Sequence, residues 1–170
     1  MGDRLVIGID PGPQTSGLVV YLLPQTGGWG LVLRSYKEAT LEQVRMELDH
    51  IHLERQRTAG PDVEVVLECT QAGPPSTHVV KTTEVVGRIM EACDTRGLTW
   101  HAYYRREVLQ ALGCARTGNK DSLVRCAVIE LHGGDKKTAC GTKKNPGPLY
   151  GVASHAWQAL GVVCAHILPF

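Results

Sequence analysis

Two carboxylates stand where an apolar, strand-like segment ends. The β-branched run Leu5–Ile9 is closed by Asp10 and a Pro-Gly turn, and the run Asp62–Leu67 is closed by Glu68. A carboxylate at the end of a strand lies at the edge of a sheet, where solvent and ligands reach it. A single aspartate there is usually only a turn former. We expect the two strands to be neighbours in the sheet, and the two acids then repel each other unless a divalent cation neutralises them, so the pair predicts a metal site.

Hydrophobic periodicity and turn residues predict the elements that hold these acids. Three antiparallel strands come first, and later strands follow helical crossovers, which indicates parallel pairing. The fold class is therefore α/β, a mixed five-stranded sheet with helices on both faces. The expected strands are 5–9, 17–23, 30–36, 62–68 and 98–103; the expected helices are 41–58, 77–96, 105–112, 120–131 and 151–167, with a loop over 133–148.

Size and composition favour one globular domain over residues 1–170. Hydrophobic residues make up 43% and charged residues 21% of the chain, which is typical of a folded protein. No apolar run reaches the roughly 20 residues that a membrane span needs. The strand-like segment that begins at Leu5 leaves no room for a signal peptide, so we expect a cytoplasmic protein. None of the six cysteines forms a CxxC pair, which argues against a disulfide framework or a zinc site.

The positive charge is gathered in local clusters although the net charge is only +1. Such a pattern suits a protein that keeps acids for metal and bases for phosphate. A solvated surface with Lys-rich loops explains the same pattern, and on charge alone it is the favoured interpretation. The candidate DNA contacts in these clusters are Arg105, Arg106, Arg116, Lys143 and Lys144.

Five segments, in this order, resemble the RuvC family of Holliday-junction resolvases, which have a ribonuclease H-like fold. Each motif alone is weak, but together they span nearly the whole chain. The loop 141–151 resembles that of phage-encoded members more than that of the bacterial repair enzyme. The segments are Ile7–Gly12 with Ser16-Gly17, Val65–Glu68, the helix around Gly87-Arg88, Gly118–Asp121, and Ser154–Leu160.

The resemblance implies an activity and a set of roles. It implies a metal-dependent endonuclease that cleaves phosphodiesters in branched DNA, most of all Holliday junctions, by in-line attack of water assisted by two Mg²⁺ or Mn²⁺ ions. Asp10, Glu68 and His155 are the implied metal ligands. Lys120 is the implied basic group that steadies the phosphate charge. Symmetric cutting of two strands implies a homodimer with two sites.

One departure from the family pattern keeps other functions open. The last helix of the family has a second ligand, usually Asp, three residues after the first, whereas this chain has Gln158 three residues after His155. An uncharged amide is a poor ligand for a hard cation, so we expect two carboxylates in the site and weaker metal binding. A branched-DNA-binding protein that has lost cleavage is the main alternative.

Two other enzyme classes share features of this chain. Sugar kinases and actin-like ATPases open with a similar Gly-Ile-Asp strand and turn, but they need a second domain for which 170 residues leave no space. A related nuclease of the YqgF type, which acts on RNA, shares the same core and is harder to separate from a resolvase.

Overall fold

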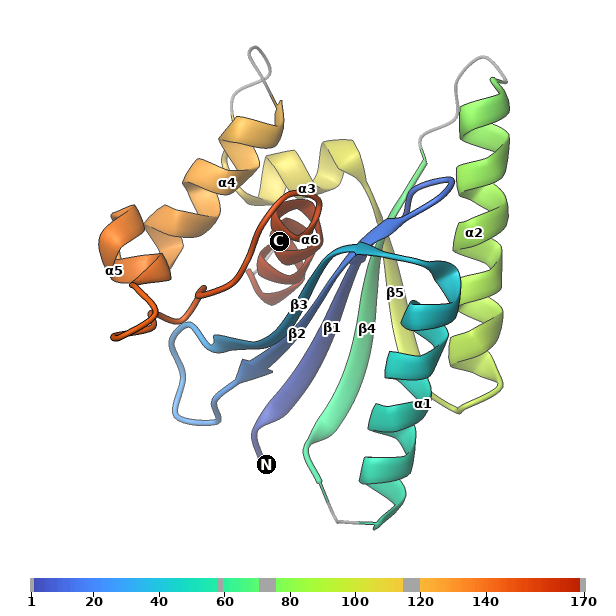
Figure 1. Cartoon of the computed structure of the whole chain (residues 1–170), viewed down its shortest axis with the longest axis horizontal. Helices are drawn as coiled ribbons and strands as arrows, with labels where there is room; N and C mark the ends of the chain where they lie inside the picture. The colour runs from blue at the N-terminus through green and yellow to red at the C-terminus, as the bar shows by residue number, and fades with distance from the viewer. Residues whose placement is uncertain (1, 58–59, 71–75, 115–119, 169–170) are drawn as a thin grey trace.

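A five-stranded sheet with the order β3-β2-β1-β4-β5 forms the centre of the molecule (Figure 1). This computed structural model describes residues 2–57, 60–70, 76–114 and 120–168. Strand β2 is antiparallel to β1 and β3, whereas β4 is parallel to β1 and β5, which confirms the predicted mixed sheet. The strands are β1 (Arg4–Asp10), β2 (Ser16–Leu23), β3 (Leu31–Ala39), β4 (Asp62–Cys69) and β5 (Thr99–Tyr104).

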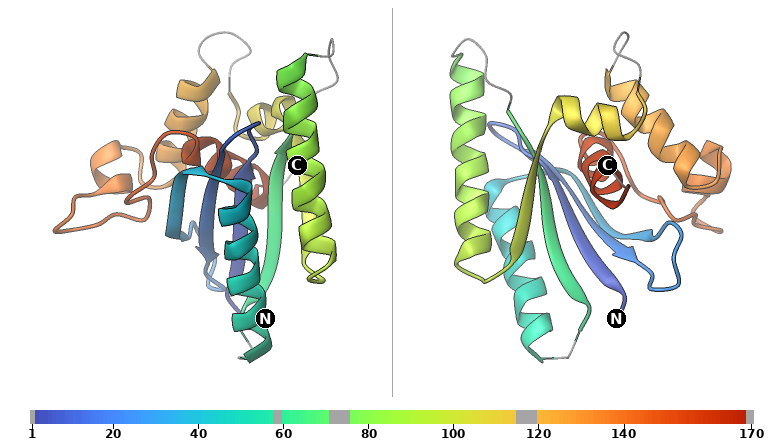
Figure 2. Two further views of the ribbon diagram at one scale, coloured as in Figure 1. Left: turned by 45° about the vertical axis from the view of Figure 1, so that its right-hand side comes forward. Right: turned by 180° about the vertical axis from the view of Figure 1, so that it is seen from behind.

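Helices cover both faces of the sheet. On one face α1 and α2 lie side by side, and on the other α6 lies across the strands with α3 and α4 packed against it (Figures 1 and 2). Short α5 packs against α4. The helices are α1 (Leu41–Arg57), α2 (Thr77–Asp94), α3 (Arg105–Ala111), α4 (Lys120–Leu131), α5 (Lys136–Cys140) and α6 (Ala156–Ile167).

Capping side chains precede the helices α1 and α2. Thr40 and Gln43 form a reciprocal capping box, in which each side chain accepts a hydrogen bond from the backbone N–H of the other. The Ser76 hydroxyl accepts a hydrogen bond from the Val79 N–H at the start of α2. Such caps satisfy N–H groups that have no partner within the helix.

Two of the expected boundaries were wrong. The segment 133–148 is not a continuous loop, because Asp135 caps the short helix α5 by accepting hydrogen bonds from two backbone N–H groups. The last helix begins at Ala156 instead of 151, and the residues before it form turns. The glycine and proline content of the region concealed the helix, although Asp135 was a readable cap.

Alternation along β1 separates the two layers of the core. Val6 packs with α6, whereas Ile7 and Ile9 pack in the cluster that includes residues of α1 and α2. Because strand side chains alternate between faces, Asp10 shares the α6 face with Val6. By the same rule Glu68 shares that face with Val66, which also packs in the α6 cluster. The pleat thus directs both acids toward α6.

Two glycines allow α6 to lie close to the sheet. A side chain at Gly8 would collide with the Ala159 carbonyl oxygen, and one at Gly17 would collide with the His155 carbonyl oxygen. Gly17 pairs with Asp10 across β1 and β2. This close approach therefore brings the start of α6 beside the end of β1.

Among the described residues, no helix is long and apolar enough to cross a membrane.

Candidate active site

Asp10 and Glu68 occupy equivalent places on adjacent strands. The parallel register of β1 and β4 pairs Ile9 with Leu67, and each acid is the next residue of its strand. Their side chains are 19% and 15% exposed, respectively. The structure therefore brings together the two carboxylates that the sequence predicted to be neighbours.

Arg105 is the cation that faces these acids. From the start of α3 its guanidinium donates a hydrogen bond of 3.0 Å to Oε2 of Glu68 and one of 2.6 Å to Oε1 of Gln158. It also forms an ion pair with Asp121 in the first turn of α4. The guanidinium thus joins β4, α4 and α6 at a single point.

Burial and mutual repulsion perturb the titration of both acids. Burial, and after it the negative charge of Glu68, raises the pKa of Asp10 to about 7, although Arg105 works against this rise. The pKa of Glu68 is also raised, again chiefly by burial, while the charge and hydrogen bond of Arg105 oppose the increase. The raised pKa values mean that the surroundings do not supply enough positive charge to compensate both carboxylates when they are ionised.

His155 lies next to Asp10 at the N-terminal end of α6. Its Nδ1 atom is 3.7 Å from Oδ2 of Asp10, and its side chain is 59% exposed. The imidazole is therefore reachable by a ligand and is attracted to the carboxylate when it is protonated. Of the three predicted metal ligands, Asp10 thus lies beside Glu68 on the adjacent strand and beside His155 at the start of α6.

Gln158 is buried and faces the same site. Its amide oxygen accepts the hydrogen bond from Arg105, and its amide nitrogen donates to the Asp121 backbone carbonyl at 3.5 Å. The residue that departs from the family pattern therefore orients Arg105 and connects α6 to α4.

Asp121 is a third acid that the sequence analysis did not select. Its charge contributes to the raised pKa of both Asp10 and Glu68, so it belongs to the same electrostatic cluster. The available signal was an acidic residue in the first turn of a helix, which normally indicates only helix stabilisation. Only the packing of α4 against α6 makes it part of the site.

The remaining predicted residues do not converge with this cluster to the same degree. Arg106, Lys120, Lys143 and Lys144 are exposed. Lys120 directly precedes Asp121 at the start of α4, whereas the two lysines lie in the loop after α5. Arg116 lies outside the described residues.

Known proteins resemble this chain in fold and not in sequence. No protein-family model matches the chain, and no curated protein matches its sequence. The solved structure of Thermus thermophilus RuvC superposes with a TM-score of 0.65 and 23% identity, over 96% of this chain and 93% of that one. T. thermophilus RuvC in complex with Holliday junction substrate gives 0.63 and 21%, over 96% and 92%.

The chain has the RuvC fold. The mixed sheet, its strand order and its helices are those of the ribonuclease H-like class. At 21–23% identity this likeness concerns the arrangement of the elements. Chemistry must be argued from this chain's own side chains.

The arrangement can hold a cation and a phosphodiester together. Carboxylates suit hard divalent ions, while the nearby Arg105 and the exposed Lys120 carry positive charge suited to phosphate oxygens. His155 adds an exposed imidazole beside Asp10. Asp10, Glu68 and His155 are thus the candidate ligands, with Asp121 within electrostatic range.

Proposed function

We propose that this protein is a metal-dependent endonuclease that cleaves phosphodiesters in branched DNA, most of all four-way junctions. The observation that carries the proposal is the cluster of Asp10, Glu68 and Asp121 with His155 at one end of α6, on a chain that has the RuvC fold. Two largely buried, mutually repelling acids destabilise a folded protein unless a cation compensates their charge, and such pairs cluster at functional sites.

The residues present fit a divalent cation. The raised pKa of Asp10 shows that its negative charge is poorly compensated even with Arg105 nearby. A cation at this point would favour the ionised form of both acids. Asp10, Glu68 and His155 would hold Mg²⁺ or Mn²⁺, with two ions in each site. Such ions supply charge stabilisation and a water of lowered pKa for phosphodiester hydrolysis.

The other side chains have distinct roles in the proposal. His155 is exposed and adjacent to Asp10, so it can also orient a water or accept a proton near the acids. Lys120, exposed at the start of α4, would steady the charge of the scissile phosphate. Arg105 neutralises Glu68 and Asp121, so it would compete with an entering cation and move or share its contacts with these acids.

The choice of substrate rests on the comparison and on symmetry. One of the matched RuvC structures is a complex with Holliday junction substrate. Resolution of such a junction requires two symmetric cuts, so we propose a homodimer that carries one site per subunit. The basic side chains of Arg106, Lys143 and Lys144 are exposed and available to DNA phosphates. Arg116, which lies outside the described residues, is proposed as a DNA contact from the sequence alone. The similarity of the loop 141–151 to phage-encoded members makes a phage origin part of the proposal.

Labelled DNA tests the proposal directly. A four-way junction and a matched duplex are incubated with the protein in Mg²⁺, in Mn²⁺ and in chelator. We expect paired symmetric nicks near the branch point, only on the junction and only with metal. The Asp10→Asn variant should bind the junction and not cut it. Retained cleavage by this variant would contradict the assignment, and cleavage of forks or flaps alone would move the substrate away from junctions.

A second function, branched-DNA binding without cleavage, is favoured by one specific observation. Arg105 already neutralises Glu68 and Asp121 with short contacts and is itself held by Gln158. Acids whose charge is already compensated by a guanidinium bind a metal ion less strongly. Tight junction binding with no nick under either metal would support this function over the nuclease.

A further inference from the structure

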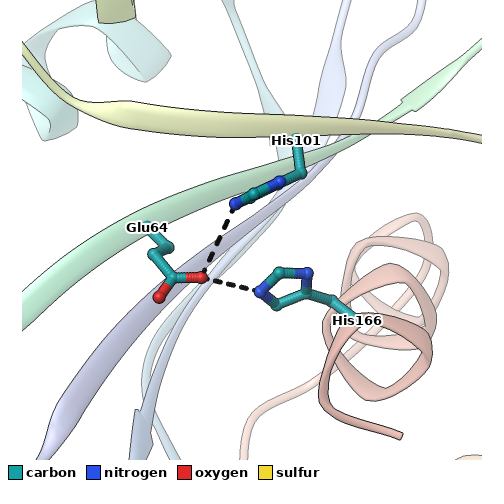
Figure 3. Close-up of side chains that lie close together, drawn as sticks. All are labelled: Glu64, His101 and His166. Carbon is teal, nitrogen blue, oxygen red and sulfur yellow. Dashed lines mark hydrogen bonds and ion pairs between the residues drawn. The ribbon is translucent and has the colours of Figure 1, made fainter. Parts of the chain in front are cut away.

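A second cluster of ligand-type side chains lies at the other end of α6. Glu64 comes from β4, His101 from β5 and His166 from the last turn of α6, and the three side chains point toward one another (Figure 3). Nε2 of His166 is 2.7 Å and Nε2 of His101 is 3.8 Å from the same oxygen of Glu64. One ligand atom from each residue lies within 4.8 Å of the others.

This cluster is separate from the acids at the end of β1. Glu64 precedes Glu68 by four residues, about 13 Å along an extended strand. His166 follows His155 by eleven residues, about 16 Å along a helix. No residue is shared between the clusters, so the inference that follows is independent of the proposed nuclease.

The chemistry of the three groups suits a transition metal. Two imidazoles and one carboxylate are ligands of Zn²⁺ and related ions, whereas Mg²⁺ prefers oxygen alone. Ligand atoms about 2 Å from one zinc ion lie about 3.3 Å from each other. The contacts of 2.7 Å and 3.8 Å to Glu64 bracket that spacing, so small side-chain rotations would produce it.

The surroundings provide the supporting contact that metal-bound histidines usually have. The Tyr103 hydroxyl lies 2.7 Å from Nδ1 of His166. Without metal, Nε2 of His166 donates to Glu64 and Nδ1 accepts from Tyr103. With metal on Nε2, the imidazole proton would move to Nδ1 and donate to the Tyr103 oxygen, which fixes the ring for coordination.

The exposed fractions of the three side chains suit a metal site that is held in place and is open to solvent on one side. His166 is 10% and Glu64 is 23% exposed, which holds them in place, while His101 is 42% exposed and leaves a route for an ion. Among the described residues, Arg4 is the other positively charged side chain in contact with Glu64, and its Nη2 lies 3.4 Å from both Oε1 and Oε2. The histidines contact Oε2 at 2.7 Å and 3.8 Å, so an ion at this oxygen would compete with Arg4 there, while Arg4 could keep its contact with Oε1.

We propose that Glu64, His101 and His166 bind one transition-metal ion of the Zn²⁺ class and thereby clamp the C-terminal end of α6 to β4 and β5. Positive charge near a helix C-terminus is also favoured by the helix dipole. Three protein ligands leave a fourth position for water, as in an open zinc site. The ion would fix the helix whose other end carries His155.

Titration of the tag-free, chelator-treated full chain with Zn²⁺ and with Co²⁺ tests the site. Calorimetry gives stoichiometry, and the visible absorption of Co²⁺ reports its ligand geometry. The protein used is the Asp10→Asn variant, which weakens the separate acidic cluster as a source of signal. We expect one ion per chain, a rise in Tm with Zn²⁺, and little competition from excess Mg²⁺.

Matched variants in the same background decide the ligands. His101→Asn should lower Zn²⁺ affinity at least tenfold, and Tyr103→Phe by about tenfold because it removes the supporting contact. His78→Asn, an exposed histidine at the start of α2, should bind as the parent does. Because His101 is half exposed, its variant should fold. No Zn²⁺ binding by the parent, or equal affinity with and without the His101 imidazole, would overturn the proposal.

Discussion

Arg105 donates a hydrogen bond of 3.0 Å to Glu68, across the boundary between α3 and the end of β4. The same guanidinium pairs with Asp121 and opposes the rise in the pKa of both Asp10 and Glu68. The protein therefore carries its own cation at the point where a metal ion is proposed. This contact makes the first prediction.

Removal of Arg105 should strengthen metal binding. The Arg105→Ala variant loses one positive charge beside three acids, so the excess negative charge rises and Mg²⁺ competes with no guanidinium. We expect a several-fold gain in Mg²⁺ or Mn²⁺ affinity, measured as the metal-dependent rise in Tm. Arg106→Ala, which removes an exposed neighbouring charge, is the control. Weaker metal binding by Arg105→Ala would mean that the arginine positions the ligands instead of competing with the ion.

Asp10 should make the metal-free protein less stable as the pH rises. Its folded-state pKa is about 7 against an ordinary value of 3.8, so the folded state holds this proton more tightly than the unfolded state. Stability is therefore lost between pH 4 and 7 as the unfolded chain ionises first, by roughly 4 kcal/mol at full extent.

The Asp10→Asn variant checks that sign. In chelator it should be more stable than the parent at pH 8 and close to it at pH 4, where Asp10 is protonated in the folded state and only partly ionised in the unfolded state. Denaturant unfolding at the two pH values measures the difference. Equal stability of the two proteins at pH 8 would show that the carboxylate is well compensated.

The missing negative charge at Gln158 should limit the affinity of the site for metal ions. Gln158→Glu keeps the shape of the side chain and its contact with Arg105 but adds a negative charge to the cluster. We expect tighter Mn²⁺ and Mg²⁺ binding and a further rise in the pKa of Asp10, followed by NMR titration of the carboxyl. Gln110→Glu, exposed on α3, controls for net charge. Unchanged metal affinity would place Gln158 outside the metal's surroundings.

Replacement of Gly17 should reduce junction cleavage more than it reduces the stability of the fold. A Cβ there meets the His155 carbonyl, so Gly17→Ala should push the start of α6 from β1 and cost about 1 to 3 kcal/mol. We expect a loss of junction cleavage at temperatures where the variant remains folded by circular dichroism. Gly87→Ala, on an exposed face of α2 with open space around it, should be neutral or stabilising by up to about 1 kcal/mol.

Tyr21 should contribute to stability through a buried hydrogen-bond chain. Its hydroxyl accepts from the Gly30 N–H and donates to Nε2 of His132 at 2.8 Å, while Nδ1 of His132 donates to the Val128 carbonyl. Tyr21→Phe leaves two buried groups without their partner, so unfolding should become easier by about 2 to 3 kcal/mol. Tyr150→Phe, at an exposed tyrosine, should change stability little. Chemical denaturation compares the two.

Much of the scaffold was readable from local sequence rules. The apolar runs, the turn after Asp10 and the capping residues Thr40 and Ser76 each act over a few positions, so they predict strands and helix starts directly. Handedness and crossover rules then place β1 beside β4, and from that pairing follows the approach of Asp10 and Glu68. These two acids were therefore predictable as neighbours.

Contacts between distant elements were decided only in three dimensions. Asp121 and Arg105 look like a helix-start acid and a surface base, and nothing local indicates that α3, α4 and α6 bring them to Glu68. His166 lies 102 positions after Glu64, and no spacing rule connects them. Local patterns specify which face a residue occupies; which residues share that face at one point depends on helix packing, and that is a property of the whole fold.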